Sequence, residues 1–346
     1  MRLFLTELRK ILISNYALPI MLAAVILQAV TAFIPRAYDY PYSVDVYMRY
    51  TEKLEGEYTA EKEIFLRSLY EEYSVTIAEY SVRREEYLNG KITLEEFSEY
   101  TSQNSIANAE ISTIQYLLEK CEYLDNAGGF QKEIFYDTDI TKFFEGLGFD
   151  FIMLLALLCI VIPVFDREYT GKSTALILTS RYGKARLAIL KMFAVAIVIF
   201  AFSWCISAVR LGMHFGRYGN GFFDRAVGNL MGYDGIGNMS VLEYYLTDTL
   251  IKAVCWTVCA VKVCLITVIC KNTSFSFIIS FLIIALPLLL NGVGGGAAGM
   301  YVFDTVNLMR LYPTSLNFGI FAAVSGVKTT VYVWLTVRLW GYRKGI

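Results

Sequence analysis

Long apolar runs constrain what this chain can fold into more than any other feature of its sequence. Several of them reach the roughly 20 residues that a helix needs to cross a bilayer, and 56% of all residues are hydrophobic. Charged residues make up only 18% of the chain, which is less than a soluble protein of this length carries. We therefore expect an all-α polytopic membrane protein that lies in the cell membrane.

The apolar runs predict six transmembrane helices. The first lies within residues 1–34, and the others lie at 147–165, 187–210, 245–270, 275–291 and 320–339. Lys and Arg gather in the N-terminus, the loop 166–186, the turn 271–274 and the tail 340–346. Because short cytoplasmic segments carry the positive residues of membrane proteins, both termini are predicted to be cytoplasmic. No small-residue cleavage site follows the first run, so this helix is expected to remain uncleaved.

The net charge of −1 conceals a strong separation of acids from bases. Residues 36–145 carry 23 acids and 11 bases, a net charge of 11 − 23 = −12, whereas the remainder carries 20 bases and 9 acids, or 20 − 9 = +11. Such asymmetry indicates parts of a chain that lie in different compartments. The acidic block therefore belongs to an extracytoplasmic domain at 35–146, and the other predicted outer segments are 211–244 and 292–319.

The acidic domain is predicted to be a helical hairpin between the first and second transmembrane helices. Apolar residues recur three and four apart from Thr59 to Leu88, and Asn89-Gly90 would stop this helix. Thr93 and Glu96 have the capping-box pattern that starts a second helix, which Asn126–Gly129 would end. We interpret the apolar stripe as packing between the two helices; the alternative is a surface that binds a peptide or another partner. The stripe consists of Leu66, Leu69, Tyr73, Ile77, Tyr80 and Tyr87.

A nucleotide site, a metal site and a catalytic centre are not expected in this chain. The segment 170–174 looks like the end of a P-loop, but Asp166 stands where that motif needs Gly, and an apolar run rather than a strand precedes it. Cys255 and Cys259 share a helix face, yet the single histidine, His214, lies far from them in the sequence. No residues have the pattern of a nucleophile with its base and orienting group. The chain is therefore not expected to be an enzyme or to bind a cofactor.

Four ionisable residues fall inside the predicted transmembrane helices. Asp248, Lys252 and Lys262 lie in the fourth helix, and Lys328 lies in the sixth. Charged groups are costly in lipid and commonly mark functional pathways, so these four are candidates for a polar translocation path. Asp248 precedes Lys252 by one helical turn, which predicts an ion pair. The alternative for the lysines is that each reaches a membrane surface along its alkyl chain.

The segment between the second and third predicted transmembrane helices is basic and amphipathic. A polar helix held between two membrane spans must project into water, and its surplus of Arg and Lys indicates the cytoplasm. We expect a structured basic segment in this position to contact a cytoplasmic partner.

With these features, the chain resembles the membrane subunit of an ABC-2-type ABC exporter. Thr6–Ile11 is similar to the amphipathic elbow helix that opens such permeases. Glu168–Gly171, Leu178–Arg181 and Leu190-Lys191 are similar to the family's loop between the second and third transmembrane helices. Thr179 departs from the pattern, because many members have Pro just before the Ser-Arg turn.

The resemblance implies that the loop 166–186 is a coupling helix that docks into an ATPase subunit. The coupling residues would then be Arg167, Glu168, Lys172, Arg181 and Lys184. ATP and Mg²⁺ would bind in separate cytoplasmic ABC ATPase subunits, and a second permease subunit, identical or related, would complete the assembly. No nucleic acid partner is expected.

The expected function is export of a peptide or of an amphipathic or hydrophobic compound. The alternative is a sensor or immunity protein that does not transport and that binds an extracellular peptide through its acidic domain. A neighbouring ATPase gene would favour transport, and a neighbouring histidine kinase gene would favour sensing.

Overall fold

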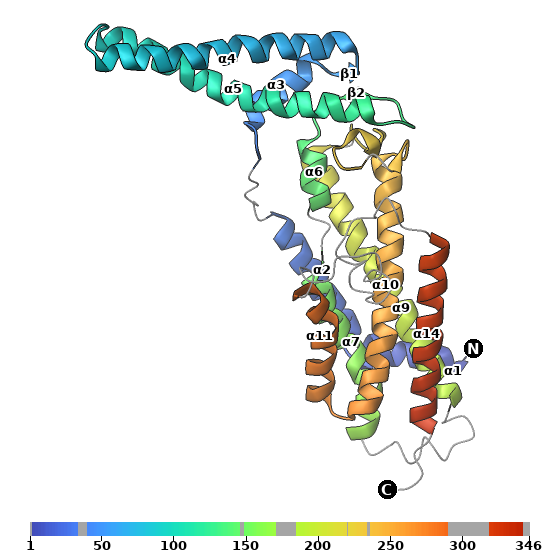
Figure 1. The fold of residues 1–346 in the computed structure, drawn as a ribbon. Coiled ribbons are helices and arrows are strands. Elements are labelled where there is room, and N and C mark those ends of the chain that lie inside the picture. The colour runs from blue at the N-terminus through green and yellow to red at the C-terminus, as the bar shows by residue number, and fades with distance from the viewer. Residues whose placement is uncertain are drawn as a thin grey trace. The chain divides into compact units, whose positions relative to one another are not determined.

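The computed structural model describes residues 2–33, 40–145, 149–170, 185–219, 221–233, 236–289 and 318–341. Helices dominate these residues (Figure 1), so the fold is all-α, as the composition and periodicity predict. In the same ranges the two strands are β1 (Gly56–Glu57) and β2 (Glu133–Ile134), which pair antiparallel with Gly56 opposite Ile134. The chain divides into two compact units. Unit 1 comprises Met1–Pro35, Phe144–Asn220 and Tyr244–Ile346, and unit 2 comprises Arg36–Phe143 and Gly221–Glu243.

Unit 1 contains the apolar helices. They are α1 (Arg2–Arg9), the π-helical turn η1 (Lys10–Ser14), α2 (Ala17–Phe33), α7 (Phe151–Thr170), α9 (Ala185–Tyr218), α10 (Val241–Cys270), α11 (Thr273–Leu289) and α14 (Phe318–Gly341). In the part of the chain that the structure describes, α9 and α10 are each long and apolar enough to cross a membrane. A third candidate arises if the bent pair Arg2–Ser14 and Ala17–Thr31 counts as one span. The predicted outer segment 292–319 and the tail 340–346 lie mostly outside the described residues.

The N-terminal helical segment is bent a few residues after Thr6–Ile11, which is predicted to resemble an elbow helix before the first transmembrane helix. The two parts meet at 54°, and Tyr16 between them has a left-handed φ of 59°. Arg167 donates hydrogen bonds to the Ser14 carbonyl and, at 3.0 Å, to Asn15 Oδ1, and its guanidinium lies 5.5 Å from the centre of the Tyr16 ring. A side chain from α7 therefore satisfies the polar groups that the break leaves without helical partners.

Helix α9 extends further than its sequence predicts. The predicted transmembrane helix stops at Arg210 because a charge commonly marks the end of a span, but α9 continues to Tyr218. Arg210 forms an ion pair with Asp150 at 2.6 Å, so its charge is compensated inside the helical unit and does not require the helix to end there. The outer loop that follows is correspondingly shorter than the predicted 211–244.

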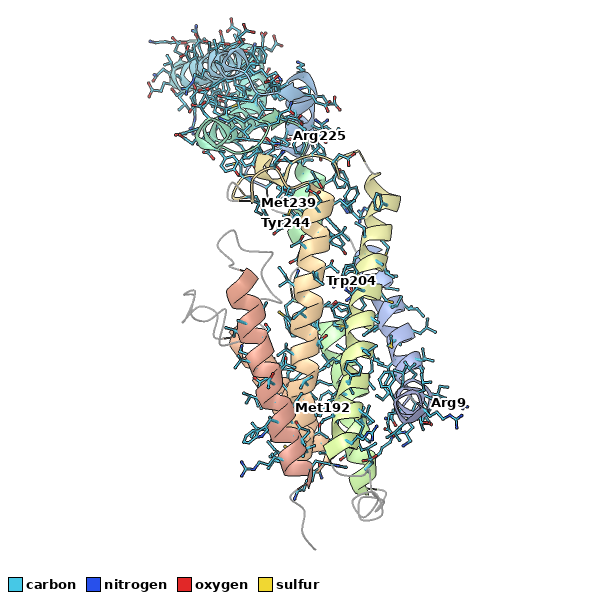
Figure 2. All side chains as sticks on the ribbon, turned by 90° about the vertical axis from the view of Figure 1, so that its right-hand side faces the viewer. Arg9, Met192, Trp204, Arg225, Met239 and Tyr244 are labelled. Carbon is cyan, nitrogen blue, oxygen red and sulfur yellow. The ribbon has the colours of Figure 1, made fainter. Side chains whose placement is uncertain are left out.

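Apolar side chains face both inward and outward in unit 1. Phe165, Phe202 and Trp340 are almost fully buried between the helices. Leu22 and Trp334, by contrast, are among the large apolar residues that stay exposed on the outer faces. Figure 2 shows side chains projecting on all sides of the long helix α9 between Met192 and Trp204. Extensive exposed apolar surface of this kind is typical of a protein that contacts membrane or another apolar partner.

Two long helices form most of unit 2. Helix α4 (Ala60–Leu88) and helix α5 (Leu94–Asn126) lie side by side (Figure 1), and a short turn from Asn89 to Thr93 joins them. The predicted capping box is confirmed, because the Thr93 hydroxyl accepts from the Glu96 backbone N–H while the Glu96 carboxylate accepts from the Thr93 N–H. Gly90 in the turn adopts a φ of +71°, which suits glycine. The shorter helices of this part are α3 (Val44–Lys53), α6 (Thr138–Glu145) and the 3₁₀ turn η2 (Val227–Asn229).

The segment 221–243 belongs to unit 2 although 211–244 is predicted as a separate loop. Asn229 accepts from the Glu133 backbone N–H at 2.8 Å and donates to the Gln131 carbonyl at 3.1 Å, and Tyr123 donates to the Gly228 carbonyl at 3.0 Å. A Cβ on Gly228 would lie 2.5 Å from the Phe130 ring, so only glycine fits there. These contacts join residues that are distant in sequence, so no local sequence pattern predicts them.

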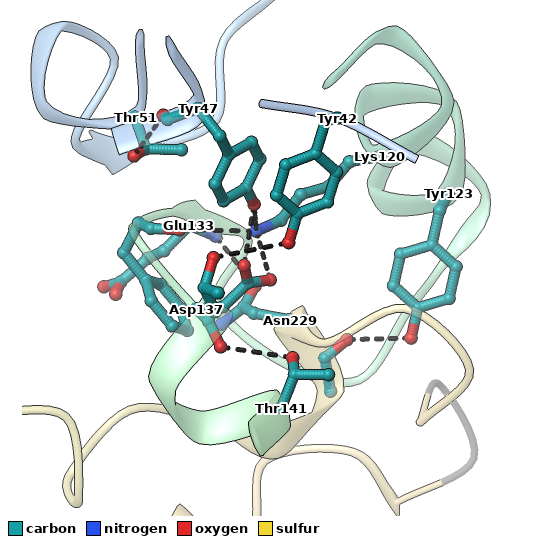
Figure 3. A network of polar contacts seen from close by, with 12 residues as sticks. Tyr42, Tyr47, Thr51, Lys120, Tyr123, Glu133, Asp137, Thr141 and Asn229 are labelled. Atoms are coloured by element: carbon teal, nitrogen blue, oxygen red, sulfur yellow. Dashed lines mark hydrogen bonds and ion pairs between the residues drawn. The ribbon is translucent and has the colours of Figure 1, made fainter. Parts of the chain in front are cut away.

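A buried ion pair lies at the core of unit 2 (Figure 3). Lys120 is fully buried and donates to Asp137 at 2.6 Å and to the Tyr47 hydroxyl at 3.1 Å. Tyr47 in turn donates to the second oxygen of Asp137 at 2.7 Å. Burial, and then the nearby charge of Asp137, raises the pKa of Tyr47 well above its ordinary value. The carboxylate and the ammonium thus compensate each other where neither could remain alone.

Candidate functional site

The predicted coupling residues lie at and inside the loop between α7 and α9. Lys172, Arg181 and Lys184 lie outside the described residues. Arg167 and Glu168 lie near the C-terminal end of α7, at the point where the chain enters that loop. The structure therefore describes the two ends of the predicted coupling segment and what those ends contact.

A buried lysine joins the two ends of this segment. Lys191 near the start of α9 is 2% exposed. It forms an ion pair with Glu168 of α7 and a longer one, at 3.7 Å, with Glu7 of α1. It also donates to the Val164 carbonyl at 3.0 Å. We call Glu7, Lys10, Glu168 and Lys191 the Lys191 cluster, because Lys10 binds the same Glu7 at 2.7 Å.

Two further contacts fix the end of α7 against its neighbours. Asp166, which is buried, accepts a hydrogen bond from the Thr273 hydroxyl at the start of α11. Arg167 donates hydrogen bonds to the Ser14 carbonyl and to Asn15 Oδ1 at the break between η1 and α2. The end of α7 therefore contacts η1, the break before α2, α9 and α11 through charged or polar groups, and it is linked to Glu7 of α1 through Lys191.

The Lys191 cluster has an arrangement that can transmit displacement. A buried ammonium must keep a carboxylate partner, because an uncompensated charge in an apolar setting costs several kcal/mol. Lys191 has two such partners, one at the entrance of the loop and one on α1. A shift of Glu168 would therefore either move Lys191 with it or transfer Lys191 toward Glu7. In both cases the movement passes from the loop to a neighbouring helix.

A second polar group lies elsewhere in unit 1, around a small cavity. The cavity has a volume of about 20 Å³, which is room for roughly one water molecule. Its polar lining consists of Asp150, Ser203, Ser207, Arg210 and Lys252. The apolar remainder is Met153, Ile206 and Trp256.

Four helices contribute charged or amide groups near this cavity. Asp150 accepts from Arg210 at 2.6 Å and from Gln28 of α2 at 2.5 Å, and its other oxygen caps α7 by accepting from the Met153 N–H at 2.9 Å. Arg210 of α9 also donates to Gln28 Oε1 at 3.2 Å. Lys252 of α10 completes the group. Ions and amides from α2, α7, α9 and α10 thus meet where apolar packing would otherwise be expected.

Of the four predicted path residues, the structure brings two together. The predicted ion pair between Asp248 and Lys252 is confirmed, with a separation of 2.8 Å. Lys262 lies ten residues further along α10, about 15 Å away at 1.5 Å per residue, and its ammonium sits 5.8 Å from the centre of the Tyr332 ring. Lys328 is on α14, one helical turn before Tyr332. Neither Lys262 nor Lys328 lines the cavity.

Six residues that are central to these two groups are not among the site residues predicted from the sequence. They are Glu7, Asp166 and Lys191 at one, and Gln28, Asp150 and Arg210 at the other. The signal that could have found them is a pairing of charges at matching ends of neighbouring apolar runs. Glu168 and Lys191 flank one loop, and at the other side of the same two apolar runs Asp150 directly precedes α7 while Arg210 follows the apolar part of α9.

The described residues contain no group of three His, Cys, Asp or Glu side chains that could hold a metal ion. A scan against models of protein families, a search of curated proteins and a search of solved structures each find no match to this chain.

Proposed function

We propose that this chain is the permease subunit of an ATP-driven exporter of the ABC-2 type. It would cross the membrane six times with both termini in the cytoplasm, and separate ABC ATPase subunits would power it. The observation that carries the proposal is the Lys191 cluster, because it connects both ends of a basic loop to the helix α1 that precedes the first predicted span.

The construction of unit 2 supports the alternating topology. Unit 2 combines the connection between α2 and α7 with the connection between α9 and α10. Two segments that fold together must lie on the same side of a membrane. The opposite ends of these helices meet at Arg167, Asp166 and Lys191. Helices α2, α7, α9 and α10 would therefore each cross from one side to the other, with the acidic unit outside and the basic loop inside.

The proposed mechanism begins when ATP binding draws the ATPase subunits together and moves the loop 166–186. Glu168 then carries the movement to Lys191 and α9, and Glu7 carries it to α1. Arg167 carries it to the bend between η1 and α2. The loop thereby biases an equilibrium between two arrangements of the helices, which is the physical requirement for coupling between distant sites.

The polar cavity would belong to the pathway that these arrangements open and close. Asp150, Arg210 and Lys252 line a space with room for one water molecule, which is too small for a peptide or an amphipathic compound. In the proposed mechanism the described arrangement would correspond to a closed state. Opening would separate α2, α7, α9 and α10 at a place where ionised groups, rather than close apolar packing, line the gap.

Site-directed labelling tests the topology. In a background that lacks the seven native cysteines, Glu72→Cys should react with a membrane-impermeant thiol reagent in intact cells, and Ser173→Cys should not. Labelling at Ser173 alone would invert the topology, and labelling at both positions would exclude the spans between them.

Copurification and ATPase measurements test the coupling. Lys191→Met should leave membrane insertion intact but lower export relative to ATP hydrolysis by at least tenfold. Lys10→Met is the matched control, since it removes a lysine from the same Glu7 but is half exposed and lies on one side of the cluster only. Arg181→Glu in the loop should weaken ATPase copurification, while Lys344→Glu in the tail should have little effect. If no ATPase copurifies and Lys191→Met behaves as wild type, the transport proposal is wrong.

A further inference from the structure

The outer ends of α4 and α5 lack a core. From Arg67 to Ile106, which we call the distal arm, no side chain is buried, although all of these residues are described. The buried side chains of the two helices begin at Leu66 on α4 and at Ala107 on α5 and continue toward the opposite end of the pair. Full burial therefore ends at Leu66 and Ala107, although the two helices remain side by side beyond them.

Full burial on α4 and α5 ends near the point where α3 no longer lies beside them. Tyr47, Tyr50 and Thr51 of α3 are buried, and Arg49 forms an ion pair with Glu110 of α5. In this part α3 packs in one core cluster with α4 and α5, and Leu69 and Tyr73 at the start of the distal arm still pack against that cluster. In Figure 1 the rest of the distal arm continues past α3. Two helices bury little surface without a third element, so the distal arm has the form of a three-helix layer from which one helix is absent.

The distal arm retains apolar groups that a third helix would cover. Tyr80 and Tyr87 stack against Phe97 with ring centres 5.7 and 4.5 Å apart, and all three rings remain partly exposed. Val75 and Val82 are each 57% exposed. They are seven residues apart and therefore lie on one face of α4.

The charge of the distal arm specifies the partner. It carries eight acids and four bases, a net charge of 4 − 8 = −4. Seven of the acids form no ion pair with any described residue, and of these Glu96 is engaged in the capping box with Thr93. The other six are Glu71, Glu72, Glu79, Glu85, Glu95 and Glu99. Carboxylates without partners beside apolar groups suit a ligand that presents cations along one side and an apolar face on the other.

We propose that the distal arm binds a cationic amphipathic helix, which takes the place that α3 occupies along the rest of α4 and α5. The 22 residues from Arg67 to Leu88 span about 33 Å, so the bound segment would be about 20 residues long. A second copy of the arm is disfavoured because it carries the same negative charge, and an anionic lipid surface is disfavoured for the same reason. The proposal concerns unit 2 and holds whether or not the chain exports its ligand.

Binding to the full-length protein in phosphatidylcholine nanodiscs tests the proposal. The probe is a fluorescent 20-residue peptide of leucine and lysine with helical amphipathic periodicity. It should bind the protein, and its affinity should fall as salt rises. A peptide with the same composition in scrambled order, and one with glutamate in place of lysine, should each bind at least tenfold more weakly. Equal binding of all three peptides, or equal binding to nanodiscs without protein, would overturn the proposal.

Charge reversal locates the surface. Glu72 and Glu79 are two turns apart on α4, and the double variant E72K/E79K should raise the Kd of the lysine peptide at least tenfold. The matched control E122K/D125K makes the same change in charge on exposed residues of α5 outside the distal arm and should change the Kd less than threefold. Equal effects of the two double variants would show attraction to net charge alone and contradict a defined surface. Cross-linking of distal arms from two chains would identify a second copy as the occupant and would also contradict it.

Discussion

The two units each contain a buried lysine, and the two lysines differ in how many carboxylates they share. Lys120 in unit 2 binds one carboxylate, Asp137, whose other oxygen accepts from Tyr47. Lys191 in unit 1 lies between two carboxylates, Glu168 and Glu7, which belong to different helices. The first arrangement has its polar atoms in mutual contact, and the second divides one cation between two anions.

The difference indicates that the two buried lysines have different structural roles, although burying either ammonium costs free energy. A buried ion pair whose groups have no alternative charged partner favours one arrangement of its surroundings. Separating the two groups leaves each charge without a partner. A cation that is shared between two anions keeps one partner when it loses the other. The geometry at Lys120 therefore suits a domain that must hold its shape, and the geometry at Lys191 suits a joint between helices that move.

The largest expected effect is that of Lys120→Met. It leaves Asp137 buried without its cation, which costs about 3–5 kcal/mol. Hydrogen exchange of α5 amides in the full-length protein measures the loss, and protection should fall by roughly two to four orders of magnitude. The double variant K120M/D137L should recover most of it, because removing both charges is far less costly than removing one. Protection unchanged by Lys120→Met would show that this pair does not hold unit 2.

A smaller effect is expected for Glu168→Gln. Lys191 then keeps Glu7 as its carboxylate, so the cost is that of a hydrogen bond to a charged group, about 1.5–3 kcal/mol. Amide exchange at the start of α9 measures it. The double variant E7Q/E168Q should cost more than the sum of the two single variants, since only the double variant leaves Lys191 without a carboxylate. Additive effects would show that the two carboxylates do not substitute for each other, and the comparison between the lysines would fail.

Alkaline titration gives a third and milder test. Burial, and then the charge of Asp137, raises the pKa of Tyr116 to about 12 from an ordinary value of 10.0, and the pKa of Tyr47 is raised as well. Between pH 10 and 12 these tyrosines lose their phenolic protons in the unfolded chain but retain them in the folded unit. The stability of unit 2 therefore does not depend on their titration below pH 10, and it falls as the pH rises from 10 toward 12. Hydrogen-exchange protection of the α5 amides should fall over the same pH range. Tyr116→Phe should make this pH dependence smaller. No tyrosine binds Lys191 among the described residues, so amides beside Lys191 serve as the reference.

The smallest expected effect is that of Arg67→Met. Arg67 forms an ion pair with Glu63 at 2.7 Å, but its side chain is largely exposed. Water and salt screen such a pair, and long side chains lose entropy in holding it. We expect no measurable change in α5 protection. A change as large as that for Lys120→Met would mean that burial does not separate strong pairs from weak ones in unit 2.

The parts of the fold that depend on local chemistry were predictable from the sequence. The Thr93 capping box, the stop at Asn89-Gly90 and the end of the next helix at Asn126 all appear as expected. Each depends on residues within one or two turns of the helix end. The docking of Asn229 between Gln131 and Glu133 was not predictable, because it depends on a meeting of segments about a hundred residues apart that have no shared pattern.

The candidate site shows the same division. Asp248 and Lys252 are one turn apart on one helix, so their ion pair could be predicted from spacing alone. Glu7 and Lys191 are not related by any periodicity, and Arg210 was interpreted as the end of a membrane helix because its partner Asp150 comes from another helix. A charged residue inside the helical unit could therefore not be predicted from the sequence where its partner is distant in sequence.

The composition of unit 2 from two separate segments has a consequence for how the protein is made. Residues 36–143 are synthesised first, but the positions that receive Gly228 and Asn229 stay vacant until α7, α9 and the segment 221–243 have been synthesised. Gly228 fits beneath Phe130 only because it has no side chain. In the proposed topology, completion of unit 2 would thus depend on correct insertion of the helices between its two parts. A chain inserted with the wrong orientation would leave Phe130 uncovered for quality control to recognise.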